Sequence, residues 1–334
     1  MNGVIIIGGG AAGIAAAIAA AEAGERVVVL ERGRKILKKL GVTGNGRGNL
    51  LNCGKPVYFG DEAFALSVLS HMPYAQTAAF LHQCGIPLVE EAEGRMYPSS
   101  YLAASAVDAL ALRVRSLPIQ VEENTRAAAV FPVPGGFGVQ AKRAVYAPDT
   151  VLKSGRVKPG ALEREEDAVF EARRVIVAVG GAASPMHGTD GTGYALLTAL
   201  GHTMTQPRPA LCALVTDTRP IEGLSGQRVR ASLSLDGHES RGEALFAQDG
   251  VSGIAAMQLS RFAHEGSVLC MDLREAVMGF EGDALVWLHE RAALRQGLNA
   301  GDLLTGAASV PVARALLRRA GVSPRADLSA LTDS

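Results

Sequence analysis

Short apolar runs alternate with glycine turns and an alanine-rich segment over the first thirty residues of the chain. The run from Val4 to Ile7 ends in glycines, which is the pattern of a parallel strand buried on both faces. Residues 11–23 are mostly alanine and predict a helix that ends at Gly24. A second buried strand follows over 26–30 and closes at Glu31. The pattern therefore predicts a β-α-β unit.

The pattern changes after Glu31. A segment rich in Gly, Lys and Asn over 32–54 predicts an ordered functional loop rather than a continuing series of strands and helices. Helical spacing follows over 61–84 and 99–115, and short alternating runs over 119–144 predict a hairpin or a three-stranded meander.

The remainder of the chain predicts a return to the first sheet and then a second domain. We expect a polar surface excursion over 147–167, a buried strand over 174–179, a short helix over 194–201, the start of a β-rich domain over 207–235, and an arginine-rich helical region after 265. These elements predict an α/β protein with a Rossmann-like domain over 1–205, which includes a β-meander near 119–145, and an inserted β-rich and helical domain over 206–334.

Composition narrows the possible partners. The 334 residues carry 33 basic and 33 acidic side chains, so no overall field attracts a nucleic acid or an anionic membrane, and neither is expected as a partner. Aromatic residues make up only 5%, which provides few stacking platforms for single-stranded nucleic acid. The four cysteines lack metal-ligand or redox spacing, and no metal site is predicted. The apolar stretch over 4–23 is interrupted by glycines and by Glu22, which a membrane-spanning helix would not contain, and it lacks the pattern of a signal peptide. We therefore predict a cytoplasmic protein.

A dinucleotide fingerprint lies at the first strand-to-helix turn. Gly8 permits the tight turn, Gly10 lets a pyrophosphate approach the backbone, and Gly13 lets the helix pack on the strand. The helix N-terminus offers free N–H groups to phosphate, and Glu31 can accept hydrogen bonds from adenosine ribose hydroxyls. The predicted cofactor contacts in this part of the chain are Gly8, Gly10, Ala11, Ala12, Gly13, Glu31 and Arg32.

The layout after Glu31 favours FAD over NAD. NAD domains usually continue directly into a third strand, whereas here a glycine-rich loop and helices follow, and the sheet resumes after the meander. No second G-x-G-x-x-G follows a strand, so any NAD(P)H is expected to bind transiently without a nucleotide domain of its own.

Five collinear segments carry a family resemblance over most of the chain. They are GGGAAGIAAA from Gly8, TGNGRGNLLN from Thr43, RMYPSS from Arg95, VIVAVGGAASPMHGTDGTGYALLTALGHT from Val175, and GEALFAQDGVSGIAAMQLSR from Gly242. The sequence resembles the bacterial flavoproteins described as BaiN-like or aminoacetone-oxidase-family NAD(P)/FAD-dependent oxidoreductases. The resemblance implies a two-dinucleotide-type FAD domain that is interrupted by a smaller domain.

The resemblance also implies further cofactor contacts. The glycine-rich loop is expected to lie along the flavin and the ribityl chain, the return strand beside the cofactor, and one meander backbone group against adenine. These residues are Thr43, Gly44, Asn45, Gly46, Arg47 and Asn49 in the loop, Ala178, Gly180 and Gly181 in the return strand, and Ala127 in the meander. The family usually has Cys where this chain has Gly48, so a thiol has no role at that position.

The segment HGTDGTGY offers candidates for acid-base chemistry. His187, Asp190 and Tyr194 lie within eight residues, and a turn before a helix with Asp190 as its cap is the more common explanation of such a pattern. No catalytic residue is assigned from the sequence.

The end of the chain departs from the family pattern. The family normally ends with a segment that returns to the FAD sheet and closes over the flavin, and this chain stops at LTDS before such a strand. We therefore expect weak FAD binding and a tendency to self-associate through an unpaired strand edge.

The expected function is hydride transfer through FAD between NAD(P)H and a small organic substrate. A flavin oxidase of a small amine or amino ketone, and a non-catalytic FAD- or ADP-binding remnant, remain as alternatives. In the first two cases the flavin supplies the chemistry and the protein supplies orientation and exclusion of water.

Overall fold

The protein is described by a computed structural model that covers residues 2–55, 57–279, 282–295 and 297–328. The chain divides into two compact units, Met1–Thr205 and Gln206–Ser334. Each unit has its own sheet and core, and each is described by itself. Whether the second unit is an insertion into the first stays a prediction.

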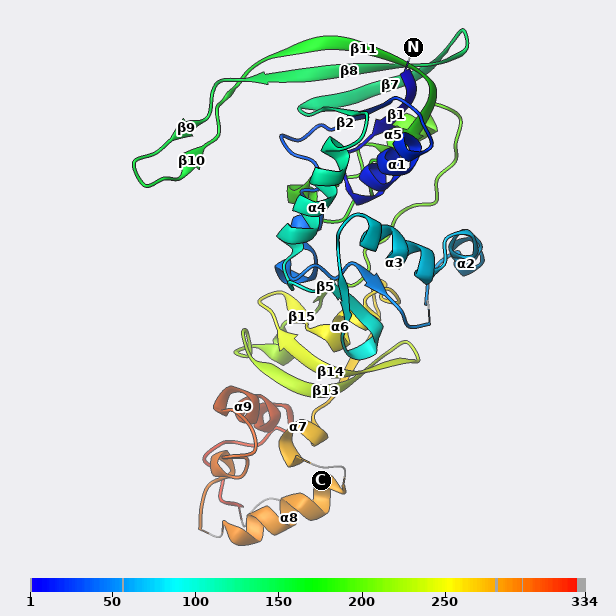
Figure 1. Ribbon diagram of the computed structural model, residues 1–334. Helices are drawn as coiled ribbons and strands as arrows, with labels where there is room; N and C mark the ends of the chain where they lie inside the picture. Colours follow the sequence, from blue (N-terminus) through cyan, green and yellow to red (C-terminus); the bar gives the residue numbers. More distant parts are fainter. Residues whose placement is uncertain (1, 56, 280–281, 296, 329–334) are drawn as a thin grey trace. The chain divides into compact units, whose positions relative to one another are not determined.

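The first unit is built on a six-stranded sheet (Figure 1). Four strands are parallel, and the last of them pairs with an antiparallel hairpin. The spatial order is β6 (Ile119–Glu122), β2 (Val27–Leu30), β1 (Asn2–Ile7), β11 (Leu162–Val177), β8 (Gly136–Tyr146) and β7 (Thr125–Val133). The order β6-β2-β1 is the right-handed β-α-β arrangement of a Rossmann-like fold.

The prediction of a meander over 119–144 is partly wrong. Residues 119–122 form β6, which pairs in parallel with β2 and is the third strand of the dinucleotide fold, while β7 and β8 form the antiparallel hairpin. A four-residue alternating run such as IQVE reads the same in a parallel edge strand as in a hairpin strand, so the sequence pattern could not separate them.

Helices and small sheets complete the first unit. The helical elements are α1 (Ala11–Glu22), η1 (Leu40–Gly46), α2 (Glu62–His71), α3 (Tyr74–Gln83), η2 (Ala92–Gly94), α4 (Ala103–Arg115), η3 (Pro185–His187) and α5 (Tyr194–Thr198). One small sheet has the strand order β3 (Leu51–Asn52), β5 (Arg95–Pro98) and β4 (Leu88–Glu90). A second consists of β9 (Thr150–Val151) and β10 (Val157–Lys158).

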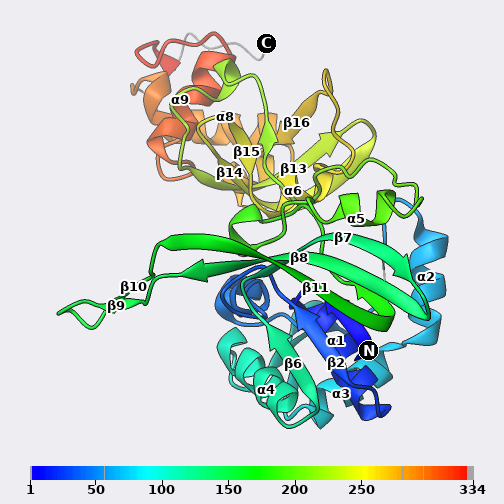
Figure 2. The ribbon, with the colours of Figure 1, turned by 90° about the horizontal axis from the view of Figure 1, so that it is seen from above.

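Alternating residues of β1 serve two cores. Val4 and Ile6 pack with apolar residues of α1 and α4, whereas Ile5 and Ile7 belong to a cluster with residues of β7, β8 and α5. Because both faces of β1 are buried, its sequence is continuously apolar. Figure 2 shows α1 and α4 on one side of the parallel strands.

The second unit has a five-stranded sheet and a group of short helices. The sheet order is β12 (Leu214–Val215), β15 (Gly250–Ser252), β14 (His238–Phe246), β13 (Arg228–Leu235) and β16 (Leu269–Asp272). The helices are η4 (Arg219–Ile221), α6 (Ile254–Leu259), α7 (Arg274–Met278), α8 (Ala284–Leu294), η5 (Ala300–Asp302) and α9 (Val310–Arg319). Within the described ranges, none of the helices is long and apolar enough to cross a membrane.

Shortening a buried side chain of β1 should destabilise the first unit. Ile6 is fully buried and pairs across the sheet with Ile176, whose exposed fraction is 39%. We expect Ile6→Ala to lower the free energy of unfolding by roughly 2 to 5 kcal/mol, because it leaves a cavity, and Ile176→Ala to lower it by less than about 1 kcal/mol. Urea unfolding followed by circular dichroism measures both, and fluorescence of the one tryptophan, Trp287, follows the second unit. Equal losses in the two variants would contradict this assignment of the core.

Candidate functional site

The turn between β1 and α1 is held by glycines that have no room for a side chain. Gly8 has φ +110°, and a Cβ there would collide with the Ala178 carbonyl. A Cβ at Gly13 would collide with the Gly8 carbonyl. Gly10 is different, because a Cβ built on it meets no atom within 4 Å. Two glycines are therefore needed for packing, whereas the space beside Gly10 is open to a ligand.

The open space lies at the positive end of a twelve-residue helix. Gly10 is the N-cap in extended conformation, it has no side-chain cap, and the first intrahelical bond is from the Ile14 N–H to the Gly10 carbonyl. The N–H groups of Ala11, Ala12 and Gly13 thus lack intrahelical acceptors, as at any helix start. Gly10, Ala11 and Ala12 are also exposed. Such a terminus suits a phosphate group.

Glu31 ties the end of β2 to both neighbouring loops. One carboxylate oxygen accepts a hydrogen bond from the Gly9 N–H at 2.7 Å, and the other accepts one from the Gly33 N–H at 2.6 Å. Each oxygen keeps a further lone pair that could accept from a ribose hydroxyl. Glu31 therefore orders the glycine turn itself, a role that the sequence pattern did not indicate.

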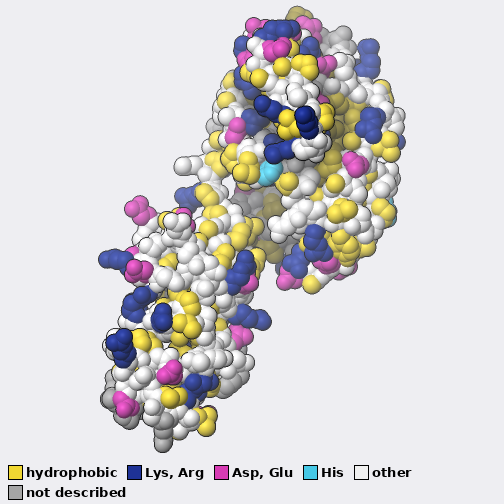
Figure 3. Space-filling view, turned by 90° about the vertical axis from the view of Figure 1, so that its left-hand side faces the viewer, with side chains coloured by type: hydrophobic (Ala, Val, Ile, Leu, Met, Phe, Trp, Pro, Cys, Tyr) yellow, Lys and Arg dark blue, Asp and Glu magenta, His cyan; other side chains and the backbone are white. Residues whose placement is uncertain are grey.

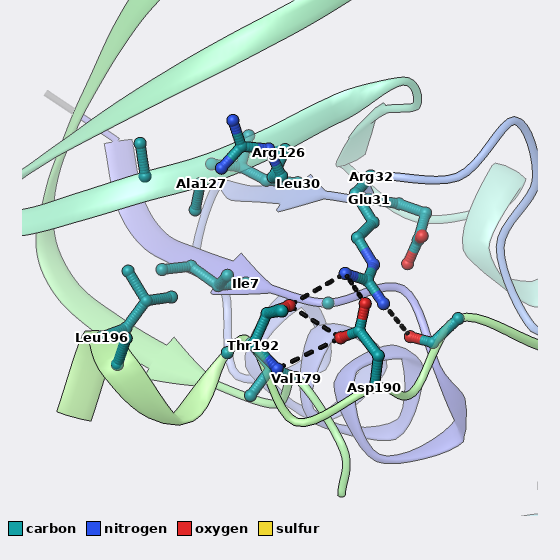
Figure 4. Close-up of a pocket in the computed structure, with 15 residues that line it drawn as sticks. Ile7, Leu30, Glu31, Arg32, Arg126, Ala127, Val179, Asp190, Thr192 and Leu196 are labelled. Carbon is teal, nitrogen blue, oxygen red and sulfur yellow. Dashed lines mark hydrogen bonds and ion pairs between the residues drawn. The ribbon is translucent and has the colours of Figure 1, made fainter. Parts of the chain in front are cut away.

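A cavity of about 220 Å³ opens beside Glu31 (Figure 4). Its walls come from the ends of β1 and β2, from β7, and from the segment that follows β11. Four of the predicted residues line it together: Gly8, Glu31, Arg32 and Ala127. The other predicted residues are not part of its lining.

A bulge in β7 turns backbone groups toward this cavity. Ala127 pairs with Ala141 and Ala129 pairs with Gln140, so Ala128 is the extra residue and lacks an opposite partner. Both Ala127 and Ala128 line the cavity. A bulge bends its strand and changes the direction of the neighbouring groups, and bulges are frequent next to functional sites. Because a bulge depends on pairing with another strand, Ala128 could not be predicted from the sequence pattern.

Arg32 bridges the end of β2 to the segment after β11 (Figure 4). Its guanidinium donates to Asp190 Oδ2 and Thr192 Oγ1 at 3.0 Å, and to the Gly188 carbonyl at 2.7 Å. Hydrogen bonds from Arg32 and then from Thr192 hold the pKa of Asp190 well below its usual range. Arg32 thus binds protein groups in this structure, and its predicted contact with a cofactor stays a prediction.

The expected capping role of Asp190 is wrong. The N-cap of α5 is Gly193 and has no side-chain hydrogen bond, while Asp190 accepts from the Thr192 N–H at 3.1 Å in a local turn. The carboxylate is instead recruited by Arg32, 158 residues away in sequence. His187 contacts Ser184, and Gly181 lies against the Tyr194 hydroxyl, so the three polar residues of this segment do not converge on one another.

The glycine-rich loop has a run of left-handed backbone. Gly44, Asn45 and Gly46 have φ of +57°, +55° and +83°. In the described part of the chain, no hydrogen bond is formed by the side chains of Thr43, Asn45 and Asn49. Glycine and asparagine tolerate this left-handed conformation best, which explains these residue types in the loop.

Arg47 is turned toward the protein rather than left free. It donates to Glu91 Oε1 at 2.6 Å, and its guanidinium lies 4.6 Å from the centre of the Tyr97 ring and 5.0 Å from that of Tyr101. The predicted donation from Arg47 to a cofactor therefore competes with an existing ion pair. Gly48 has φ +83° and is buried against Pro98 and Ala103, so glycine suits this position for packing reasons.

The return strand brings the remaining predicted residues back beside β1. The Ala178 N–H donates to the Ile7 carbonyl at 2.8 Å, which places Ala178 next to the glycine turn. Gly180 has φ +76° and packs against Thr189, and Gly181 follows it. These positions continue the line of the sheet toward the start of α1.

Comparison with known proteins agrees with this geometry. The sequence profile described as "HI0933-like protein Rossmann domain" matches residues 2–282. The chain belongs to this family. The predicted family resemblance and the Rossmann-like α/β fold are confirmed.

Named enzymes are among the relatives of this HI0933-like chain. The 3-dehydro-bile acid delta(4,6)-reductase of Clostridium scindens is 35% identical over 276 residues, which cover 80% of this chain and 61% of that protein. The ribosomal RNA dihydrouridine synthases of Escherichia coli and Haemophilus influenzae are 24% and 25% identical, over 80% and 77% of this chain and 63% and 61% of their own lengths. The chain thus spans about three fifths of the length of these relatives. The prediction of an enzyme is confirmed at the level of the family.

The bridge from Arg32 to Asp190 predicts a pH-dependent stability. A carboxyl group whose pKa is lowered by folding adds stability above its unfolded pKa, near 3.9, and loses that contribution as the pH falls below this value. We expect Asp190→Asn to lower the melting temperature at pH 7, and the difference from the parent protein to shrink below about pH 4. The control is Glu171→Gln, since Glu171 is exposed and has no described side-chain partner. A difference that stays constant down to pH 3 would count against the bridge.

Proposed function

We propose that this chain binds FAD and belongs to an oxidoreductase that transfers hydride through the flavin. The observation that carries the proposal is the contrast among the three fingerprint glycines. Neighbouring backbone leaves no room for a Cβ at Gly8 or Gly13, whereas Gly10 faces open space at the helix N-terminus. This arrangement leaves a cradle for a diphosphate that a Cβ at Gly10 would occupy.

The remaining residues fit the other parts of the same cofactor. Glu31 presents free lone pairs beside the cavity, and the bulged backbone of Ala127 and Ala128 offers donors and acceptors to a base edge. The loop at Gly44 to Gly46 leaves the backbone without bulky side chains, which suits contact with a flat flavin ring. Bound FAD supplies hydride transfer at the flavin ring, and the protein supplies binding, orientation and exclusion of water.

We further propose that NAD(P)H is the hydride donor and that the acceptor is a small organic molecule with a carbon–carbon double bond conjugated to a carbonyl group. The name of the relative from Clostridium scindens, a delta(4,6)-reductase, supports the reductase class. The neutral balance of 33 basic and 33 acidic residues favours a small substrate over a nucleic acid. The protein is proposed to act in the cytoplasm.

The fingerprint glycines give a direct test of FAD binding. Gly10→Val should give a folded protein without bound flavin, because the new side chain enters the space left for the diphosphate. Gly13→Val should instead destabilise the fold by about 3 kcal/mol or more, because its Cβ collides with the Gly8 carbonyl. Flavin absorbance after reconstitution and urea unfolding measure the two effects. Normal flavin content in folded Gly10→Val would show that the cofactor lies elsewhere.

Anaerobic mixing of the FAD-loaded protein with NADPH or NADH tests the hydride donor. The reductase assignment predicts rapid loss of the oxidised flavin absorbance with at least one of the two, since hydride reaches the flavin directly. Aminoacetone serves as the comparison substrate. Bleaching by aminoacetone and not by either nicotinamide would replace the reductase by the flavin oxidase, and no bleaching by any of the three would leave only a binding role.

A further inference from the structure

A two-stranded arm projects from the sheet of the first unit. Strands β8 and β11 continue beyond β7, and the chain between them forms the small hairpin β9–β10 at the end (Figures 1 and 2). Every residue from 148 to 159 is exposed, so the tip buries none of its side chains against the rest of the unit. An isolated two-stranded hairpin is only marginally stable in water, so contact with a partner would stabilise the arm.

The base of the arm is fixed to the body. Arg34, in the loop after β2, donates to Asp149 Oδ1 at 2.7 Å and to the Gly160 carbonyl at 2.5 Å, and its guanidinium lies 3.8 Å from the centre of the Tyr146 ring. Asp149 also accepts from the Gly160 N–H at 2.8 Å. These contacts clamp the two strands together beyond the end of β7, next to the small hairpin. The tip is therefore carried at a defined place rather than on a loose loop.

Charge is divided along the arm. The tip, defined here as residues 150–160, contains Lys153, Arg156 and Lys158 and no acid. None of these three side chains has a hydrogen-bond or ion-pair partner among the described residues. The shaft, defined here as residues 163–167, contains four carboxylates and one arginine. Figure 3, seen from the side toward which the arm points, shows Lys and Arg side chains gathered on the first unit.

The shaft keeps a surplus of negative charge after its own ion pairs. Arg164 lies 2.8 Å from Glu166 and 4.0 Å from Glu163, so two carboxylates share one cation, and Lys142 lies 3.3 Å from Asp167. Arg143 lies opposite Glu166 on β8 but is paired with Glu122 at 2.6 Å, so Arg164 and Lys142 are the cations left for the four carboxylates. A protein with no net charge has separated a positive tip from a negative shaft on the same element.

We propose that the arm is a homodimerisation element, in which the tip of each copy binds the shaft of the other. Two arms laid antiparallel about a twofold axis satisfy both charge patterns at once, as an isologous interface requires. A nucleic acid or an anionic membrane would attract the tip and be repelled by the shaft. A second copy of this chain fits both.

Apolar side chains and prolines define the kind of contact. Val151 and Leu162 are 69% and 54% exposed, and a partner arm would cover them. Pro148 and Pro159 interrupt both strands where the tip begins, and proline disfavours the addition of a further strand. Association therefore runs through side chains, and it should depend on salt.

Sedimentation velocity of the unmodified chain over a range of concentrations is the first measurement. We expect a concentration-dependent dimer in about 50 mM salt that weakens by roughly tenfold or more in about 500 mM salt, because exposed charges are screened. A monomer at every concentration would overturn the proposal. So would a dimer with no response to salt.

Charge reversal gives the sharper test. The tip variant carries Lys153→Glu, Arg156→Glu and Lys158→Glu, and the shaft variant carries Glu163→Lys, Glu165→Lys and Glu166→Lys. Each variant alone should be monomeric, because its tip and its shaft now have the same sign. An equimolar mixture should form a heterodimer, since both tip-to-shaft contacts are again attractive. Melting curves confirm that each variant is folded.

A matched control reverses three positive charges elsewhere in the chain. Arg208→Glu, Arg314→Glu and Arg319→Glu change three exposed arginines of the second unit that have no side-chain partner in the described ranges. This variant should dimerise as the unmodified chain does. A mixture of tip and shaft variants that stays monomeric would refute the pairing, as would a tip variant that dimerises normally. FAD binding plays no part in these outcomes, so they stand apart from the proposed function.

Discussion

The close approach of three backbone segments at the first glycine turn is the constraint on which the first unit depends. The start of α1 lies against the Gly8 carbonyl, and Gly8 itself lies against the carbonyl of Ala178. Three segments of chain therefore meet without intervening side chains. This contact places the helix N-terminus at the end of β1, beside the return strand, and so creates the space at Gly10 that the proposed cofactor needs.

Side-chain hydrogen bonds of two adjacent residues connect this turn to other segments of the unit. Glu31 joins the turn at Gly9 to the loop at Gly33, and Arg32 joins the end of β2 to Gly188 and Asp190. The cavity lies between these two sets of contacts. Its walls thus come from regions far apart in sequence that two adjacent charged side chains hold together.

The loop that follows shows how one segment can serve both packing and binding. Arg34 fixes the base of the arm, while Leu37, with φ +59°, is buried and its N–H donates to the Gly9 carbonyl at 2.8 Å. The cavity and the arm are therefore anchored within a few residues of each other.

The sequence by itself determined the β-α-β unit, the fingerprint glycines and the position of Glu31, because buried parallel strands and tight turns demand local residue types. It did not reveal that residues 119–122 complete the parallel sheet, that Ala128 is bulged, or that Asp190 pairs with Arg32 rather than capping a helix. Nor did it show that Arg47 stacks on Tyr97 and pairs with Glu91. Each of these depends on which distant segment becomes a neighbour, and only tertiary packing decides that.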